Sequence, residues 1–178
     1  MTSLKTIGTV FTLAILAVAV GSATAHDRKK EEVFVASLAG THEAPTSLST
    51  PARGSFRAVI DEEAGTLTYR LSYEGFVAPG TVTQAHIHFG ERHLVGGVSV
   101  FLCSNLGNGP AGTPACPLEG GVVTGTLDSA SVIGPAGQGI AIGEFAELIR
   151  AIRAGAGYAN VHSGAFPAGE IRGQLERR

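Results

Sequence analysis

The sequence predicts an all-β fold, an antiparallel Greek-key β-sandwich or barrel of about eight strands with one short helix near the C-terminus. Three observations support this prediction. Short runs rich in β-branched and aromatic residues recur along the chain, and several alternate between apolar and polar residues. The 178 residues include 25 glycines and eight prolines, which indicate frequent turns. One segment, residues 142–154, has apolar residues at helical spacing.

The clearest expected strand covers residues 66–73. There Leu67, Tyr69 and Leu71 share one face, and the residues between them are polar. The helix is expected to end at Gly155, a residue type that is common just after a helix C-terminus. The remaining expected strands are residues 33–38, 54–60, 82–89, 98–103, 122–132, 157–162 and 170–176, with a turn at 61–65 and a break at 78–80.

The N-terminus has the features of a signal peptide. Lys5 supplies a positive charge, residues 7–20 are almost entirely apolar, and residues 23–25 are Ala-Thr-Ala, the small-residue pattern that signal peptidase accepts. The apolar run is too short to span a bilayer as a helix. We therefore expect cleavage near Ala25, a charged leader at residues 26–32 and one folded domain at residues 33–176, with no transmembrane segment in the mature chain. This organisation predicts a secreted or periplasmic protein.

The charge of the chain argues against nucleic-acid binding, and its cysteine content indicates a disulfide. Lysine and arginine number 13 against 15 acidic residues, so the chain lacks the strongly basic surface of a nucleic-acid-binding protein. No nucleic-acid partner is expected. Its two cysteines, Cys103 and Cys116, flank a segment rich in Gly, Pro and Asn. In an oxidising compartment we expect them to form a disulfide that closes this loop, with free thiols as the alternative.

Histidines and other polar residues gather on one face of the expected sheet. Alternation along residues 82–89 places His86 and His88 opposite the apolar Ile87. If the last two strands are their neighbours, further polar side chains converge on the same side. These are Asn160, His162, Glu170 and Arg172.

Three interpretations of this face remain open. Neutral imidazoles of His86, His88 and His162 are suitable ligands for Cu or Zn. The pattern of a His-x-His strand followed by a later Val-His is similar to the copper site of copper–zinc superoxide dismutases, which are also Greek-key β proteins. A second interpretation is a structural hydrogen-bond network among these histidines and their polar neighbours. A third is a binding surface for a ligand or partner.

Two further histidines are weaker candidates for metal binding, and no catalytic residues are predicted. His93 lies close in sequence to the His-x-His strand, and His26 becomes the N-terminal residue if cleavage follows Ala25. The sequence has no Gly-x-Ser-x-Gly, no His-Glu-x-x-His and no P-loop motif. It therefore favours a non-enzymatic protein.

Three motifs resemble those of a known family. Residues 38–45 read LAGTHEAP, residues 85–90 read AHIHFG, and the C-terminal part carries YANVHS at 158–163 and FPAGEIRGQL at 166–175. In this order and spacing they resemble the CHRD domain, which is named for its occurrence in chordin and is found widely in bacterial exported proteins. The resemblance spans residues 33–175 and implies an extracytoplasmic β-sandwich-like module without a settled activity. The chain departs from the family at residues 91–95, where a Gly/Asn-rich turn is usual.

The sequence thus predicts an exported CHRD module that binds an unidentified extracellular or envelope ligand through the His-bearing face and adjacent loops. The alternative is a metalloprotein that holds Cu or Zn with His86, His88 and His162.

Overall fold

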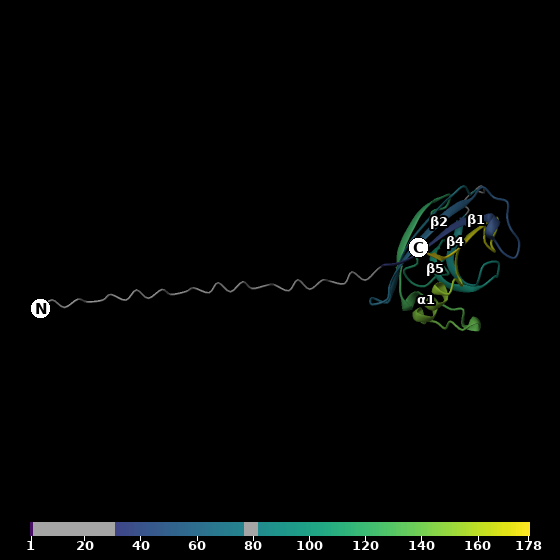
Figure 1. The fold of residues 1–178 in the computed structure, drawn as a ribbon. Helices are drawn as coiled ribbons and strands as arrows, with labels where there is room; N and C mark the ends of the chain where they lie inside the picture. The colour runs from purple at the N-terminus through teal and green to yellow at the C-terminus, as the bar shows by residue number, and fades with distance from the viewer. Residues whose placement is uncertain (2–30, 77–81) are drawn as a thin grey trace.

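The computed structural model describes Met1, residues 31–76 and residues 82–178 (Figure 1). The predicted signal peptide with its cleavage site near Ala25, the leader up to residue 30, and the break at 78–80 lie outside the described residues. Among the helices that the structure describes, none has the length and apolar character needed to cross a membrane.

The described strands form one antiparallel sheet that curves into a nearly closed barrel (Figure 1). Their bounds are β1 Glu32–Ala39, β2 Arg53–Asp61, β3 Thr66–Glu74, β4 Val82–Phe89, β5 Gly97–Ser104, β6 Gly121–Leu127, β7 Gly157–Ser163, β8 Ile171–Gln174 and β9 Glu176–Arg177. The strand order is β5-β4-β7-β8-β1-β2-β3-β6, and the short β9 also pairs with β1. Because β7 lies beside β4, and β8 returns beside β1, strands distant in sequence become neighbours. The predicted fold class is confirmed.

The inner face of the barrel is apolar, as strand alternation predicts. Phe34, Phe56 and Leu71 point inward from three neighbouring strands, and each is at most 2% exposed. The helix α1, Phe145–Arg153, contributes Leu148 and Ile152 to the same core. In Figure 1 this helix lies at one end of the barrel.

Tyrosine hydroxyls bridge the seam between the two edge strands, β5 and β6. Tyr69 of β3 donates a hydrogen bond to the carbonyl oxygen of Leu102 in β5, with an O···O distance of 2.5 Å. Tyr73, on the same strand, donates to the carbonyl of Pro117, 2.7 Å away, in the segment that leads to β6. The Tyr69 bond crosses the one place in the barrel where backbone pairing between described strands is interrupted, and the Tyr73 bond holds the segment beside it.

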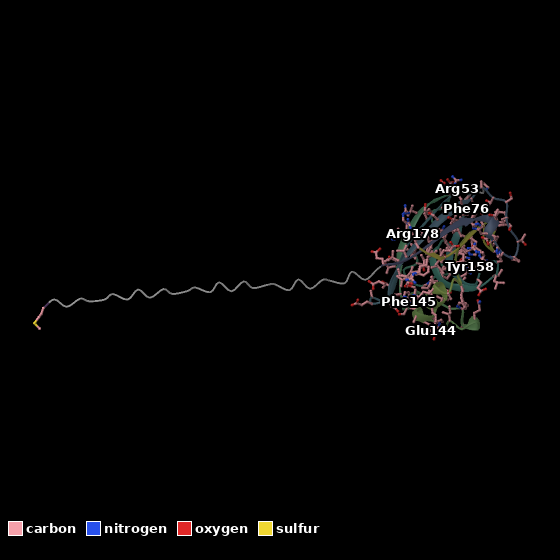
Figure 2. The ribbon with its side chains drawn as sticks, viewed as in Figure 1. Arg53, Phe76, Glu144, Phe145, Tyr158 and Arg178 are labelled. Carbon is pink, nitrogen blue, oxygen red and sulfur yellow. A yellow bond between two sulfur atoms is a disulfide. The ribbon has the colours of Figure 1, made fainter. Side chains whose placement is uncertain are left out.

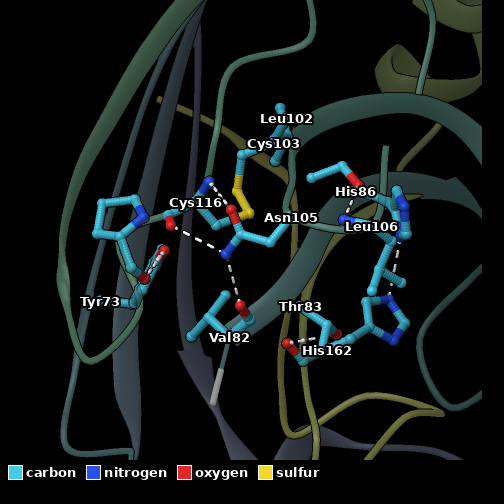
Figure 3. Close-up of a disulfide and its surroundings, with 12 residues drawn as sticks. Tyr73, Val82, Thr83, His86, Leu102, Cys103, Asn105, Leu106, Cys116 and His162 are labelled. Carbon is cyan, nitrogen blue, oxygen red and sulfur yellow. Dashed lines mark hydrogen bonds between the residues drawn. A yellow bond between two sulfur atoms is a disulfide. The ribbon is translucent and has the colours of Figure 1, made fainter. Parts of the chain in front are cut away.

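A disulfide closes the same seam. Cys103 and Cys116 lie at disulfide distance, with their sulfur atoms 2.06 Å apart, as the sequence predicted (Figure 3). The side chain of Asn105 supports the loop from inside, because its amide donates to the carbonyls of Val82 and Cys116 and its oxygen accepts the Cys116 N–H. The loop is therefore joined both to β5 and to the start of β4.

Some predicted element bounds were wrong. Residues 122–132 do not form one strand, because β6 ends at Leu127 and the side chain of Asp128 caps a short 3₁₀ turn, Ser129–Ser131. The helix begins at Phe145 rather than at residue 142, and Ile142 is 79% exposed. The last predicted strand is divided into β8 and β9, whereas Gly155 follows the helix with a positive φ of 77°, as expected.

Candidate metal centre

The candidate site lies on the outer face of β4 and β7, on the side away from the core. The strand register sets His86 opposite Asn160, and His88 opposite Tyr158. His162 lies two residues beyond Asn160 on β7, opposite Gln84, and so on the same face. The structure therefore confirms that these histidines converge. In Figure 2, Tyr158 lies within the body of the molecule, whereas Arg53 lies at its rim.

These outward-facing side chains are nevertheless buried. His86, His88 and His162 are only 2%, 8% and 5% exposed. Backbone from connecting segments covers them, since the carbonyl oxygen of Gly96 lies 3.0 Å from Nδ1 of His88 and that of Pro167 lies 3.0 Å from Nδ1 of His162. The outer face of β4 and β7 is thus an internal surface of the protein.

The three histidines lie close enough to share one ion. Nδ1 of His86 is 3.1 Å from Nε2 of His162, and Figure 3 marks this contact with a dashed line between the two rings. One nitrogen from each of the three rings lies within 4.8 Å of the others. Two ligands at tetrahedral angles on a Zn or Cu ion stand about 3.3 Å apart, so the triad would close on an ion with a movement of about 1 Å.

Backbone carbonyls determine which ring nitrogens carry hydrogen. A carbonyl oxygen only accepts, so Nδ1 of His88 and Nδ1 of His162 must each donate. Their Nε2 atoms then carry lone pairs. Nε2 of His162 faces His86, while Nε2 of His88 and Nε2 of His86 are buried without a hydrogen-bond partner among the described residues. An imidazole held by a backbone carbonyl, with its other nitrogen free, has the arrangement typical of a metal ligand.

The environment keeps all three imidazoles neutral. Burial, together with the neighbouring imidazoles of His162 and His88, lowers the pKa of His86 to about 2. Burial is also the main cause that lowers the pKa of His88 to about 4, and it lowers the pKa of His162. Metal binding requires neutral imidazole, so no proton has to leave the site before an ion enters at neutral pH.

Two aromatic rings fix the orientation of the histidines. The ring of His86 meets Phe101 edge-on, with the ring centroids 4.4 Å apart. The ring of His88 stacks on Tyr158, at a centroid distance of 4.9 Å and an interplanar angle of 6°. The Tyr158 hydroxyl oxygen also accepts the N–H of Gly96, whose carbonyl holds His88.

The sequence did not single out these supporting residues. Strand alternation could have placed Tyr158 on the His face, since it precedes Asn160 and His162 by two and four positions. Nothing in the local sequence marks Gly96 as the hydrogen-bond acceptor of His88, because that contact depends on how the segment between β4 and β5 folds back.

A second buried polar cluster lies beside the triad. The Asn160 amide donates to both carboxylate oxygens of Glu43, each 3.2 Å away. Glu43 is 7% exposed, and burial raises its pKa to about 7. The sequence assigned no chemistry to Glu43, because its position in a turn does not reveal that the turn folds over β7.

The other predicted network residues have separate partners. Arg172 lies on the predicted face, with its guanidinium 3.5 Å from the centroid of the Tyr158 ring, and donates to the carbonyl of Glu91. Glu170 is buried just before β8, and its carboxylate accepts the hydroxyl of Thr50, 2.6 Å away. Glu170 and Arg172 form no ion pair with each other, and neither has one with any other described residue.

The remaining histidines stand apart from the triad. His93 is exposed between β4 and β5 and has a positive φ of 69°, so it does not contribute to the triad in the described structure. Nδ1 of His42 bonds to the carbonyl of Arg172. His26 lies outside the described residues.

Comparison with known proteins identifies the family. No curated protein and no solved structure matches the chain. The family model described as the CHRD domain matches residues 34–175, which is nearly all of the described barrel and includes both strands of the histidine triad. The chain therefore belongs to the CHRD domain family.

Proposed function

We propose that this protein is an exported CHRD module that binds a Cu or Zn ion between His86, His88 and His162. One observation carries the proposal. Nε2 of His88 is buried with no hydrogen-bond partner in the described part of the chain, its lone pair is fixed by the Nδ1 bond to Gly96, and it belongs to a triad of neutral imidazoles within reach of one ion. Burying an unpaired nitrogen costs free energy, and a metal ion would supply the missing partner.

Burial of the triad favours a binding role over catalysis. Each ligand side chain is less than a tenth exposed, so a substrate would reach the ion only if the covering segments moved. A metal-assisted hydrolase or oxidase normally keeps an open coordination position for its substrate. The ion would therefore act in metal storage or transfer, or as a stabilising part of a module that binds an envelope or extracellular ligand.

A purely structural role for the histidines is the competing proposal. Its support is the bond between His86 and His162, which satisfies one nitrogen of each ring without any ion. It leaves two buried Nε2 atoms unpaired, so it explains less of the site than a metal does.

Metal analysis separates the two proposals. The full-length chain, without a histidine tag, is expressed with its own N-terminus, purified from periplasm or medium in metal-free buffers, and analysed by inductively coupled plasma mass spectrometry. We expect about one Cu or Zn ion per chain, and loss of that ion in His88→Ala and His162→Ala.

The matched control is His93→Asn, because His93 is exposed, lies outside the triad and has a positive φ that Asn tolerates. This variant should keep the ion. If the wild type binds neither Cu nor Zn, even when the ions are added in excess, the triad is a structural network. Circular dichroism of each variant shows whether metal loss occurs in a folded chain.

A further inference from the structure

A second surface, distant from the triad in the strand order, has features of a binding groove. It crosses the outer face of β1, β2 and β3 and encloses a volume of about 610 Å³. Ser37, Ser55 and Ser72 form a row across these strands, because the register pairs Ser37 with Ser55 and Ser55 with Ser72. Their short side chains make a polar floor. The next row holds Arg57 and Arg70, which form one side of the groove.

The two arginines of this row face each other across β2 and β3, and their contacts with acids are few. Arg57 lies directly opposite Arg70 in the register of β2 and β3, and like charges at such positions are destabilising. The nearest carboxylate to Arg57 is that of Glu31, 4.0 Å away, and Arg70 forms no ion pair within the described part of the chain. Most of the guanidinium donors in this row therefore face solvent.

Elsewhere on β2 and β3, residues of opposite charge face each other. Arg53 lies opposite Glu74, and their side chains form an ion pair at 2.7 Å. The like-charge pair is thus specific to the groove. At the far side of the groove stands Arg92, which pairs with Glu176. The groove lining holds three arginines and one glutamate, and Glu31 also reaches Arg57, so the groove keeps an excess of positive charge although the whole chain has a net charge of −2.

We propose that this groove binds an acidic polysaccharide. Guanidinium groups bind carboxylate and sulfate oxygens through paired hydrogen bonds, and serine hydroxyls both donate to and accept from sugar hydroxyls. The groove crosses three strands that are spaced about 4.8 Å apart, so it suits an extended ligand rather than a single small anion. Among the described residues the lining holds no Trp or Tyr, and its one Phe, Phe56, is 2% exposed, so the exposed His42 is the one ring there on which a base could stack, which is a poor platform for a single-stranded nucleic acid.

The polysaccharide site does not depend on the metal proposal. None of the three triad histidines lines the groove. The probe is polygalacturonate, a carboxylated sugar polymer, with neutral dextran of similar length as the uncharged comparison. Binding to the full-length protein is measured by biolayer interferometry at low salt, where exposed charges are least screened.

The decisive variant replaces both groove arginines, Arg57→Gln with Arg70→Gln. The control removes the same charge elsewhere, Arg150→Gln with Arg178→Gln, at exposed positions outside the groove lining. We expect the wild type and the control to bind polygalacturonate with similar affinity, and the groove variant to bind at least tenfold more weakly. Added salt should weaken binding, and dextran should not bind.

Four results would overturn the proposal. These are no binding of polygalacturonate by the wild type, equal binding of dextran, equal weakening in the control variant, or unchanged binding in the groove variant. Two competitors test the ligand class. If galacturonate monomer competes as well as the polymer at equal sugar concentration, the site binds small anions, and if poly-glutamate binds equally well, the site does not recognise sugar.

Discussion

The outer face of the barrel has two regions that differ in their exposure to solvent. Over β4 and β7 it carries His86, His88 and His162, and all three are buried. Over β2 and β3 it carries Arg57 and Arg70, which are exposed. Both regions belong to one sheet and follow the same alternation of inward and outward side chains.

The difference between these regions lies in what covers them. The segments after β4 and after β7 fold over this region and supply backbone carbonyls to His88 and His162, and the turn at Glu43 supplies a carboxylate to Asn160. Over the arginines the described connections leave an open groove. Alternation therefore decides which side of a strand faces outward, whereas the connecting segments decide whether that side meets water.

The largest expected effect on stability comes from substituting Gly96, which lies in the segment that covers His88. A Cβ atom at this position would lie 1.7 Å from the carbonyl oxygen of Phe89, so the backbone must move. Because Gly96 also binds His88 and Tyr158, Gly96→Ala should lower the free energy of unfolding by about 3 kcal/mol and reduce metal content. Chemical denaturation measures the first effect and mass spectrometry the second.

The matched control is Gly137→Ala, at a position where an added Cβ meets no atom within 4 Å and φ is not positive. Its unfolding free energy should change by less than about 1 kcal/mol. Equal effects of the two substitutions would show that the segment over His88 adapts freely and does not hold the site.

A smaller effect is expected on the pH dependence of stability, through the carboxyl group of Glu43, which is buried beside the triad. Burial raises the pKa of Glu43 from 4.5 to about 7, so the folded protein favours the neutral carboxyl. The associated stability is fully present below pH 4.5 and is lost as pH rises through 7. Between pH 5 and pH 8 the wild type should lose about 2 kcal/mol relative to Glu43→Gln.

Denaturation curves across this pH range test the prediction. Glu74→Gln serves as the control, because Glu74 is exposed on the open side of the sheet and pairs with Arg53. Its pH profile should follow that of the wild type. A Glu43→Gln profile as steep as the wild type's would mean that Glu43 ionises normally and that its surroundings are hydrated.

The smallest effect is expected on the open region. Arg70→Thr removes one of two like charges that face each other across β2 and β3, and Thr suits a strand. We expect the free energy of unfolding to rise by about 0.3 kcal/mol. Arg53→Thr, which breaks an ion pair in the same two strands, should lower it by a similar amount. A loss of more than about 1 kcal/mol in Arg70→Thr would mean that Arg70 serves the fold.

Short-range patterns were enough to predict most of the fold. Alternation at Leu67, Tyr69 and Leu71 identified a strand whose bounds differ by one residue from β3, and β4 has the predicted bounds. The error at residues 122–132 arose where the side chain of Asp128 binds local backbone, an interaction that competes with strand pairing and leaves no periodic signal.

The site was predictable to the extent that it lies on strands. His86 and His88 share a face through alternation alone, and His162 joins them because β7 pairs with β4. Gly96 and Glu43 were not predictable in the same way. Both act from connecting segments, and their positions depend on contacts between parts of the chain that are far apart in sequence.

The seam between β5 and β6 has a consequence for self-association. Among the described strands, each of these two has a hydrogen-bonded neighbour on one side only, and such an edge is a template for pairing with a strand of another molecule. The bond between Cys103 and Cys116 ties β5 to the segment that leads to β6, and the Tyr69 hydroxyl ties β3, the neighbour of β6, to β5. Reduction of the bond would remove one of the contacts beside this seam, and we expect the reduced protein to pair edge to edge, and so to aggregate, more readily than the oxidised one.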